Sequence, residues 1–296
     1  MKIGRAILPD GATALVLILE DGRVAEITGA GPDDLIAVAM TRQTPALGRT
    51  FALEEIRFLA PVPQPRSFRD FSAFEMHTKN CVEGIGGTMN PLWYEIPVFY
   101  FSNPNCFIDP EDTVSPPRKA KSIDYELEVA LVMGAAVRDL DAADAHWTDH
   151  VAGFMLLNDW SARDLGAQET KLFMGPAKAK DFATASGPWL ATPDEFDIVD
   201  GRIDLPLWGS VNGDRWSDGN LGEMYFNWPR LLAHASADVT LYPGDIIGSG
   251  TCASGCIIEL RFTKGRDKHV WLKAGDEVVL EAPKLGRLRN RLVEPA

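Results

Sequence analysis

Acidic residues at alternate positions lead into an apolar segment, in Asp124-Tyr125-Glu126-Leu127-Glu128 followed by Val129-Ala130-Leu131-Val132-Met133. The apolar run ends at a glycine and predicts a buried strand. Side chains alternate across a strand, so Asp124, Glu126 and Glu128 should share one face. Carboxylates this close repel one another, and we expect either raised pKa values or a hard divalent cation among their oxygens. An exposed strand face with solvated acids is the alternative.

Further candidates for chemistry lie on both sides of this segment. Asp159 ends the apolar stretch Gly153–Asp159, where a strand would present a carboxylate to a cleft. Asp70 stands upstream among aromatic residues, and His77 follows seven positions later. Histidine can accept a proton from water near neutral pH, although a lone histidine often has a structural role.

Three other patterns carry weaker signals. His146 and His150 are spaced for one helix face but lack the glutamate of an H-E-x-x-H zinc motif. Cys252 and Cys256 flank a turn without other soft ligands, so zinc is not expected there either. The glycine-rich segment 248–251 lacks a P-loop lysine. Its amides and threonine hydroxyl can hold a small carboxylate, or it is a tight turn between strands.

The elements around these residues predict a mixed, β-dominated α+β protein. Residues 1–60 suggest a small β-rich N-terminal domain with a hairpin at Asp21-Gly22 and a short helix near 33–40. A proline-rich connector, 58–65, leads into a larger domain over 61–296. We expect a helix over 141–151. Strands are expected in the C-terminal half over 203–211, 239–241, 256–262 and 277–280.

Composition excludes some classes of partner. The chain has 296 residues, a net charge of -13 and a pI near 4.8, which argues against binding to nucleic acid or an anionic membrane. No segment has the length of a signal peptide or a membrane span, so a cytoplasmic location is expected. Four cysteines without CxxC spacing are expected to be reduced thiols.

Taken together, several motifs resemble the fumarylacetoacetate hydrolase family over about residues 60–292, in the family's order. They are Arg69-Asp70-Phe71 with His77, Asp124-Tyr125-Glu126-Leu127-Glu128, Asn158-Asp159-Trp160-Ser161-Ala162-Arg163-Asp164, Gly175-Pro176 with Lys180-Asp181-Phe182, Tyr242-Pro243-Gly244-Asp245 with Gly248-Ser249-Gly250-Thr251, Ile258-Glu259-Leu260, and Leu285-Gly286-Arg287-Leu288-Arg289-Asn290-Arg291. The resemblance implies roll-like catalytic sheets behind a small N-terminal domain, and a homodimer.

The resemblance also implies roles for individual residues. A divalent cation, Mg²⁺ before Ca²⁺ or Mn²⁺, would be bound by four acids: Asp70, Glu126, Glu128 and Asp159. His77 would be the general base and Glu259 would orient it. Lys180 would stabilise negative charge on the substrate. Tyr100 and Thr251 match substrate-contacting residues of the family, and Gln168 stands near a further substrate-contacting position. The structural alternatives are a surface ion pair for Lys180, a core aromatic for Tyr100 and an arginine partner for Glu259.

The expected reaction is hydrolysis of a carbon-carbon bond in a 1,3-dicarbonyl acid, such as an acylpyruvate or a fumarylacetoacetate-like compound. His77 and Glu259 would activate water, and the metal would stabilise the leaving enolate. The same enolate chemistry also serves isomerases, decarboxylases and sugar-acid dehydratases of this family, and a catalytically silent ligand-binding protein is a further alternative.

Two departures from the family pattern concern the substrate. No arginine occurs between His77 and Pro117, although the branch that cleaves fumarylacetoacetate has one after the histidine. Lys180 follows Asp159 at a spacing one residue longer than in the family. The distal group of the keto acid is therefore open, and the aromatic segment 93–101 suggests an apolar or aromatic acyl part.

Overall fold

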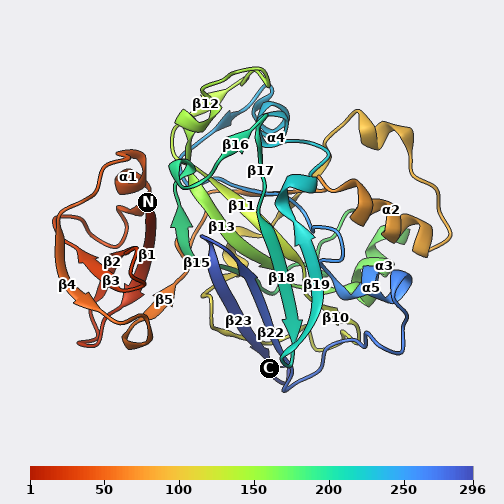
Figure 1. Ribbon diagram of the computed structural model, residues 1–296. Coiled ribbons are helices and arrows are strands. Elements are labelled where there is room, and N and C mark those ends of the chain that lie inside the picture. Colours follow the sequence, from red (N-terminus) through yellow and green to blue (C-terminus); the bar gives the residue numbers. More distant parts are fainter. Residues whose placement is uncertain (296) are drawn as a thin grey trace.

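The computed structural model describes residues 1–295 and is organised around one large mixed sheet (Figure 1). Its strands run in the order β4 (Leu47–Phe51), β3 (Val24–Ile27), β2 (Thr13–Ile18), β1 (Lys2–Ile7), β15 (Thr184–Ala191), β13 (Val151–Asp159), β11 (Leu127–Met133), β21 (Ile246–Gly248), β6 (Phe68–Phe71) and β7 (Phe99–Ser102). Two more strands belong to this sheet outside that order: β5 (Arg57–Leu59) pairs with β1, and β8 (Phe107–Ile108) pairs with β15. The N-terminal strands therefore belong to the same sheet as the strands that carry the acids.

A second sheet has five strands and packs against the centre of the large one. Its order is β19 (Asp214–Asn220), β18 (Pro206–Val211), β22 (Glu277–Ala282), β23 (Gly286–Leu292) and β9 (Thr113–Val114). Both β22 and β23 contact β13. Three strand pairs complete the β structure: β10 (Ile123–Asp124) with β14 (Ser161–Ala162), β12 (Val137–Arg138) with β20 (Thr240–Leu241), and β16 (Ile198–Val199) with β17 (Arg202–Ile203).

The helices are short. They are α1 (Leu35–Met40), α2 (Glu75–Gly84), α3 (Arg163–Lys171), α4 (Trp228–Ser236) and α5 (Ile257–Thr263). Single 3-10 turns occur at Leu53–Glu55, Pro91–Tyr94, Pro104–Cys106, Trp147–His150, Pro193–Glu195 and Leu221–Glu223. Helices α2, α3 and α5 gather on one side of the molecule, at the right in Figure 1, and α2 packs on α5. Over residues 1–295, each helix is too short or too polar to cross a membrane.

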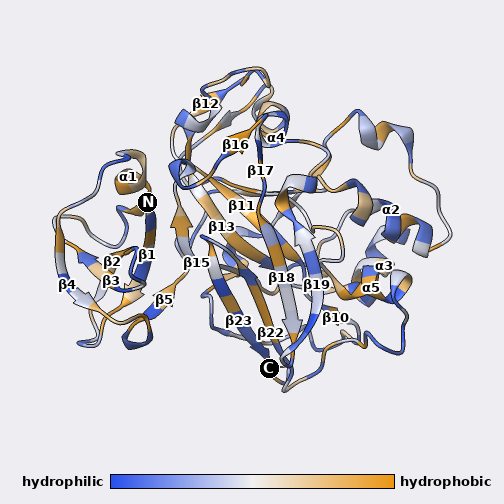
Figure 2. Cartoon of the chain, in the orientation of Figure 1, coloured by the Kyte–Doolittle hydropathy of each residue, from blue (hydrophilic) through white to orange (hydrophobic). Residues whose placement is uncertain are grey.

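The central strands β11 and β13 are buried along their whole length and are coloured as apolar in Figure 2. Alternate residues of β11 enter two different cores. Val129 and Leu131 pack into the core shared with the five-stranded sheet and α4. Ala130 and Val132 pack into the core shared with α1 and the N-terminal strands. A strand covered on both faces needs a continuous apolar sequence, which is what this segment has.

The predicted β-dominated mixed fold is confirmed. Helix α1 and the hairpin between β2 and β3 lie where the sequence places them. The expected domain boundary near residue 60 falls just after β5. Because β1 pairs with β15, hydrogen bonds join the two parts, and the boundary stays a prediction.

The helix predicted over 141–151 is wrong. This segment contains turns and one 3-10 turn, Trp147–His150. The carboxylates of Asp141 and Asp144 accept hydrogen bonds from the backbone N–H groups two residues later, at 2.9 and 2.8 Å. Such local bonds stabilise turns in place of the helical ladder.

The strand predicted over 256–262 is also wrong, because this segment forms α5. Its β-branched residues Ile257 and Ile258 favour a strand locally. In the structure, however, the N–H groups of both residues donate to the buried carboxylate of Asp124, at 2.6 and 3.0 Å. A distant acid thus satisfies the first turn of this helix, and tertiary contact overrides local preference.

Candidate active site

Four carboxylates converge where neighbouring strands of the large sheet end. Asp159 ends β13, Glu128 lies on β11, Glu126 directly precedes β11, and Asp70 lies on β6. One oxygen from each lies within 4.8 Å of the others, and each residue is at most 5% exposed. The structure therefore brings together all four residues that the sequence analysis proposed as metal ligands.

Asp124 does not join this cluster, and the continuous strand face predicted for it is wrong. The chain leaves the large sheet before β11, because β10 pairs with β14 and Glu126 only forms a bridge with Cys256. Asp124 instead accepts the α5 amides and a hydrogen bond from Arg163 Nε at 2.8 Å. Two of the three acids of the motif enter the site, and the third supports a helix.

The glycine-rich segment 248–251 forms the wall behind Asp70. Gly248 lies opposite Asp70 in the parallel pairing of β21 with β6. A Cβ at Gly248 would lie 2.3 Å from Asp70 Oδ1. Gly250 has φ +78°, and a Cβ there would lie 2.1 Å from the Phe71 carbonyl oxygen. These positions need glycine because the backbone passes directly against the strand that carries the carboxylate.

Two cations neutralise only part of the acidic charge. Lys180 Nζ contacts Glu126 Oε2 and lies 2.6 Å from Asp159 Oδ2. Arg163 bridges Asp124 and Glu126 at 2.8 and 2.7 Å. Burial makes ionisation costly for all these acids. Five buried carboxylates thus share two cationic side chains, and a further positive charge is needed if all are ionised.

The pKa values of the acids separate according to their neighbours. Burial, followed by the charge of Asp159, raises the pKa of Asp70 to about 7. Burial, followed by the charge of Asp70, raises the pKa of Glu128 well above its usual value. Burial also acts on Glu126, but Lys180 and Arg163 outweigh it and lower its pKa to about 2. Glu126 is therefore ionised in the resting protein, whereas Asp70 and Glu128 resist ionisation.

This donor set fits a hard divalent cation. Asp70 Oδ1 and Glu128 Oε2 are buried and have no hydrogen-bond partner. Buried carboxylate oxygens without partners are costly, and a cation bound by oxygen ligands would satisfy both. A cation would also supply the missing positive charge. Mg²⁺, Ca²⁺ and Mn²⁺ all accept such ligands.

The three predicted substrate-binding residues occupy different places. Tyr100 lies opposite Asp70 in the β6–β7 pairing, and its hydroxyl contacts Asp70 Oδ2 at 2.6 Å and Asp159 Oδ2 at 2.5 Å. Thr251 Oγ1 donates to Glu128 Oε1 at 3.3 Å. Gln168 is an exposed residue of α3 that does not line the cavity beside the acids. Its role stays a prediction that the geometry does not favour.

His77 and Glu259 form a hydrogen-bonded pair between α2 and α5. The ring Nδ1 lies 2.8 Å from Glu259 Oε2, and Asn80 Nδ2 donates to Glu259 Oε1 at 2.8 Å. With Nδ1–H donating to the carboxylate, Nε2 is the nitrogen left to exchange a proton with a substrate. The carboxylate fixes the ring orientation, as an orienting acid does for a catalytic histidine.

The pair also changes the proton affinity of His77. Burial lowers the pKa of His77, whereas Cys256 and Glu259 raise it, and the balance raises it to about 10. Burial also raises the pKa of the Cys256 thiol well above its usual value, so this sulfur is neutral near pH 7. Glu259 is therefore the charged neighbour of the ring. Burial acts against ionisation of Glu259, but the hydrogen bond from His77 lowers its pKa.

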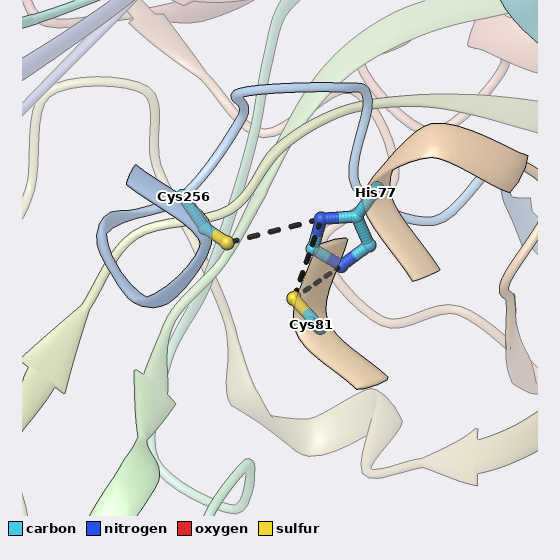
Figure 3. Close-up of side chains that lie close together, drawn as sticks. All are labelled: His77, Cys81 and Cys256. Carbon is cyan, nitrogen blue, oxygen red and sulfur yellow. Dashed lines mark hydrogen bonds between the residues drawn. The ribbon is translucent and has the colours of Figure 1, made fainter. Parts of the chain in front are cut away.

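Several residues of this region were not among the predicted site residues. Arg163, Asn80, Cys81 and Cys256 all contact predicted site residues. The sulfur atoms of Cys81 and Cys256 each lie 3.9 Å from His77 Nδ1 (Figure 3). The spacing of residues 77, 80 and 81 could have indicated a shared helix face, but Cys256 comes from a distant segment. Neither the His146/His150 pair nor Cys252 joins a potential metal cluster within residues 1–295.

A cavity of about 400 Å³ connects the two groups. Three of the four acids, Asp70, Glu126 and Glu128, line it together with His77, Lys180 and Thr251. Small or apolar residues also line it: Gly166, Ala167, Pro176, Ala179 and Ile258. Polar groups that converge in a concave space with an apolar wall are typical of small-molecule sites.

Comparisons with known proteins place this architecture in a family. The profile of the fumarylacetoacetate (FAA) hydrolase C-terminal family matches residues 66–293. A mitochondrial oxaloacetate tautomerase of Bos taurus is 32% identical over 257 residues, which cover 86% of this chain and 74% of the relative. A 2,4-didehydro-3-deoxy-L-rhamnonate hydrolase of Sphingomonas sp. (strain SKA58) is 33% identical over 203 residues, covering 67% of this chain and 65% of the relative.

Solved structures agree with the fold. A 5-carboxymethyl-2-hydroxymuconate delta-isomerase from Mycobacterium smegmatis superposes with a TM-score of 0.73 and 27% identity. That alignment covers 99% of this chain and 100% of the isomerase. The relatives thus include proteins named as a tautomerase, a hydrolase and an isomerase, so family membership alone does not define the reaction.

Proposed function

Because the chain belongs to the fumarylacetoacetate hydrolase family, we propose that it is a metal-dependent hydrolase of 1,3-dicarbonyl acids such as acylpyruvates. The reaction adds water across the bond between the distal carbonyl carbon and the methylene carbon, and gives a carboxylic acid and pyruvate. The observation that carries this proposal is the 2.8 Å contact between His77 Nδ1 and Glu259 Oε2, beside a cavity lined by three of the four acids.

Asp70, Glu126, Glu128 and Asp159 would hold the cation, and we propose Mg²⁺. When bound, the ion supplies Lewis-acid polarisation of a carbonyl and positive charge for the anion that forms as the bond breaks. Tyr100 and Lys180 keep Asp70 and Asp159 in place through the contacts described above. Half-buried Tyr100 and buried Lys180 would thus hold the proposed ligands in position.

His77 handles the proton of the attacking water. Glu259 holds Nδ1–H, which leaves the Nε2 lone pair to accept a proton while the water oxygen attacks the distal carbonyl. The resulting imidazolium is stabilised by the adjacent carboxylate. When the carbon-carbon bond breaks, Nε2–H can return this proton to the methylene carbon of the departing pyruvate. His77 thus acts first as a base and then as an acid.

Lys180 and Thr251 stabilise and orient the anion. The ammonium group of Lys180 is buried at the acid cluster and places positive charge beside the reacting carbons. The Thr251 hydroxyl lines the same cavity and can donate to the substrate carboxylate in place of its bond to Glu128. The positions of these two groups within the site support both roles.

The cavity supports a substrate with an uncharged acyl group. Among the described residues that line it, Arg163 and Lys180 already pair with carboxylates. No further arginine or lysine lines this part of the cavity to bind a second carboxylate at the distal end. The small and apolar wall suits an aliphatic or aromatic acyl part. We therefore propose acylpyruvates before fumaryl-substituted acids.

A keto-acid tautomerase or isomerase is the second candidate. The relative from Bos taurus is named as an oxaloacetate tautomerase, and the structure from Mycobacterium smegmatis as an isomerase. The same His77–Glu259 pair can move a proton between carbon and oxygen without activating water. This reaction needs no new residue, so product analysis must decide.

The test is mass spectrometry of products after the protein is incubated with acylpyruvates, fumarylpyruvate and oxaloacetate. Parallel samples contain Mg²⁺ or EDTA. We expect a carboxylic acid plus pyruvate with Mg²⁺ only, and faster turnover of uncharged acyl groups. Enol-keto interconversion of oxaloacetate without cleavage of any acylpyruvate would reject the hydrolase in favour of the tautomerase.

The oligomeric state and the cellular location of the protein are also proposals. We propose that the protein is a homodimer, as the family resemblance implies, and that it acts in the cytoplasm. Light scattering coupled to size-exclusion chromatography measures the mass in solution. A mass near that of one 32.4 kDa chain would reject the dimer.

A further inference from the structure

A second group of potential ligands lies next to the acid cluster but has different chemistry. His77 and Cys81 lie one turn apart on α2, and Cys256 lies at the N-terminal end of α5 (Figure 3). His77 Nδ1 is 3.9 Å from each sulfur, and one ligand atom from each residue lies within 4.8 Å of the others. All four cysteines of the chain are free, so both thiols can act as ligands.

These separations are close to those of a tetrahedral zinc site. With Zn–N near 2.0 Å and Zn–S near 2.3 Å, adjacent ligands lie about 3.5 Å apart for nitrogen and sulfur and about 3.8 Å for two sulfurs. Glu259 Oε2, 2.8 Å from the same nitrogen, can take the fourth position. We propose that His77, Cys81 and Cys256 form a site for a thiophilic divalent cation, Zn²⁺, that switches off the catalytic base.

The two clusters offer different ligand atoms and should therefore prefer different cations. The acid cluster offers only carboxylate oxygens, which suit Mg²⁺, whereas two thiolates and an imidazole suit Zn²⁺. Zn²⁺ binding releases the protons of both thiols and forms two Zn–S bonds. Cys81 is partly exposed, whereas Cys256 is buried.

Zinc at this position would act on catalysis through the histidine tautomer. A neutral imidazole bound to a metal through Nδ1 keeps one proton, and this proton must lie on Nε2. Nε2 then has no lone pair to accept a proton from water, and Glu259 loses the Nδ1–H that it orients. This effect on turnover rests on the proposed role of His77, whereas the metal site itself does not.

Cobalt spectroscopy tests the site without reference to activity. The EDTA-treated full-length protein is kept reduced with a phosphine, loaded with saturating Mg²⁺, and titrated with Co²⁺. Thiolate ligation produces a charge-transfer absorption in the near ultraviolet, which oxygen ligands do not give. We expect one equivalent of this signal and its loss on addition of Zn²⁺. Absence of the charge-transfer signal would overturn the site.

Cysteine variants identify which thiolates give rise to the Co²⁺ charge-transfer signal. Cys81→Ser and Cys256→Ser should each weaken Co²⁺ binding by at least about tenfold. Cys106 is partly exposed like Cys81, and Cys252 is buried like Cys256, so Cys106→Ser and Cys252→Ser are the controls. Glu128→Gln disables the acid cluster and should leave the signal unchanged. Equal signals in Cys81→Ser and Cys106→Ser would overturn the ligand assignment, provided that circular dichroism shows both to be folded.

Zinc inhibition tests the consequence for catalysis. With saturating Mg²⁺, one equivalent of Zn²⁺ should lower the wild-type rate at least about tenfold, in line with loss of a general base. The rate of Cys81→Ser with Zn²⁺ is compared with its own rate without Zn²⁺ and should change much less. A cobalt signal without zinc inhibition would reject the switch while leaving the site. A cobalt signal without turnover of any keto acid would instead reject the proposed function alone.

Discussion

The acid cluster and the His77–Glu259 pair share one cavity but are built differently. The acids lie on or beside central strands, where hydrogen-bonded neighbours on both sides fix the backbone. The base lies on α2, a helix without a single buried residue and without a side-chain N-cap, held mainly by packing on α5. Strand ladders buried in a core open rarely, whereas exposed helices open more easily. Strand pairing therefore holds the ligands, whereas the position of the base depends on the packing of α2 against α5 and on two side-chain hydrogen bonds, Tyr94 to Glu75 and Ser72 to Thr78.

Glu128→Gln should have the largest effect on activity. Its carboxylate belongs to the rigid cluster, and its Oε2 has no protein partner, so the amide removes charge without breaking an ion pair. Loss of the cation removes several kcal/mol of transition-state stabilisation, which corresponds to about a thousandfold or more in kcat/KM.

Thermal unfolding measures whether the variant still gains stability from bound Mg²⁺. Wild type should gain Tm on addition of Mg²⁺, and Glu128→Gln should not. Glu126→Gln is the matched comparison, because it also disturbs the contacts to Lys180 and Arg163 and should lower Tm in EDTA. Normal metal content together with normal activity in either variant would contradict the cluster as the metal site.

His77→Ala should have the second largest effect and should separate the two groups. Hydrolysis should fall by on the order of a hundredfold to a thousandfold, since a general base is lost. Metal content, measured by atomic emission, should stay as in wild type because the strands are untouched. Retention of acylpyruvate cleavage would show that water is activated by another group. Loss of metal would show that the two regions are not independent.

Glu259→Gln should have a smaller effect but a characteristic dependence on pH. His77 must be unprotonated to act as a base, and Glu259 helps to raise its pKa above the usual value, so the wild-type rate should rise as the pH increases above 7. The amide lacks the charge that helps to raise this pKa. The rise should therefore move to lower pH, and the plateau should fall by about tenfold. An unchanged profile would mean that Glu259 does not act on the ring.

Gln168→Ala should change kcat/KM by less than about twofold, as is usual for exposed positions away from a site. The side chain is exposed on α3 and does not line the cavity. Thr251→Ala is the contrast, because that hydroxyl lies within the site and should mainly raise KM. A large effect of Gln168→Ala on KM would indicate that α3 approaches the substrate more closely than this geometry suggests.

The sequence determined the parts of this protein that depend on local pattern. Continuous apolar runs predicted the buried strands β11 and β13, because a strand covered on both faces needs apolar residues at every position. The ordered motifs predicted that Asp70, Glu126, Glu128, Asp159, His77 and Glu259 would meet. In the structure the four acids lie close together, and His77 contacts Glu259. The motifs therefore mark the strands and helices that bring these residues to one place.

Only the tertiary structure decided which partners these residues have. Asp124 looked equivalent to Glu126 along the chain, yet a break before β11 turns it toward α5, and its carboxylate in turn allows Ile257 and Ile258 to be helical. Cys81 and Cys256 meet at His77 because α2 packs on α5. Such contacts join residues far apart in the chain, and their free energy comes from burial and packing that no local spacing records.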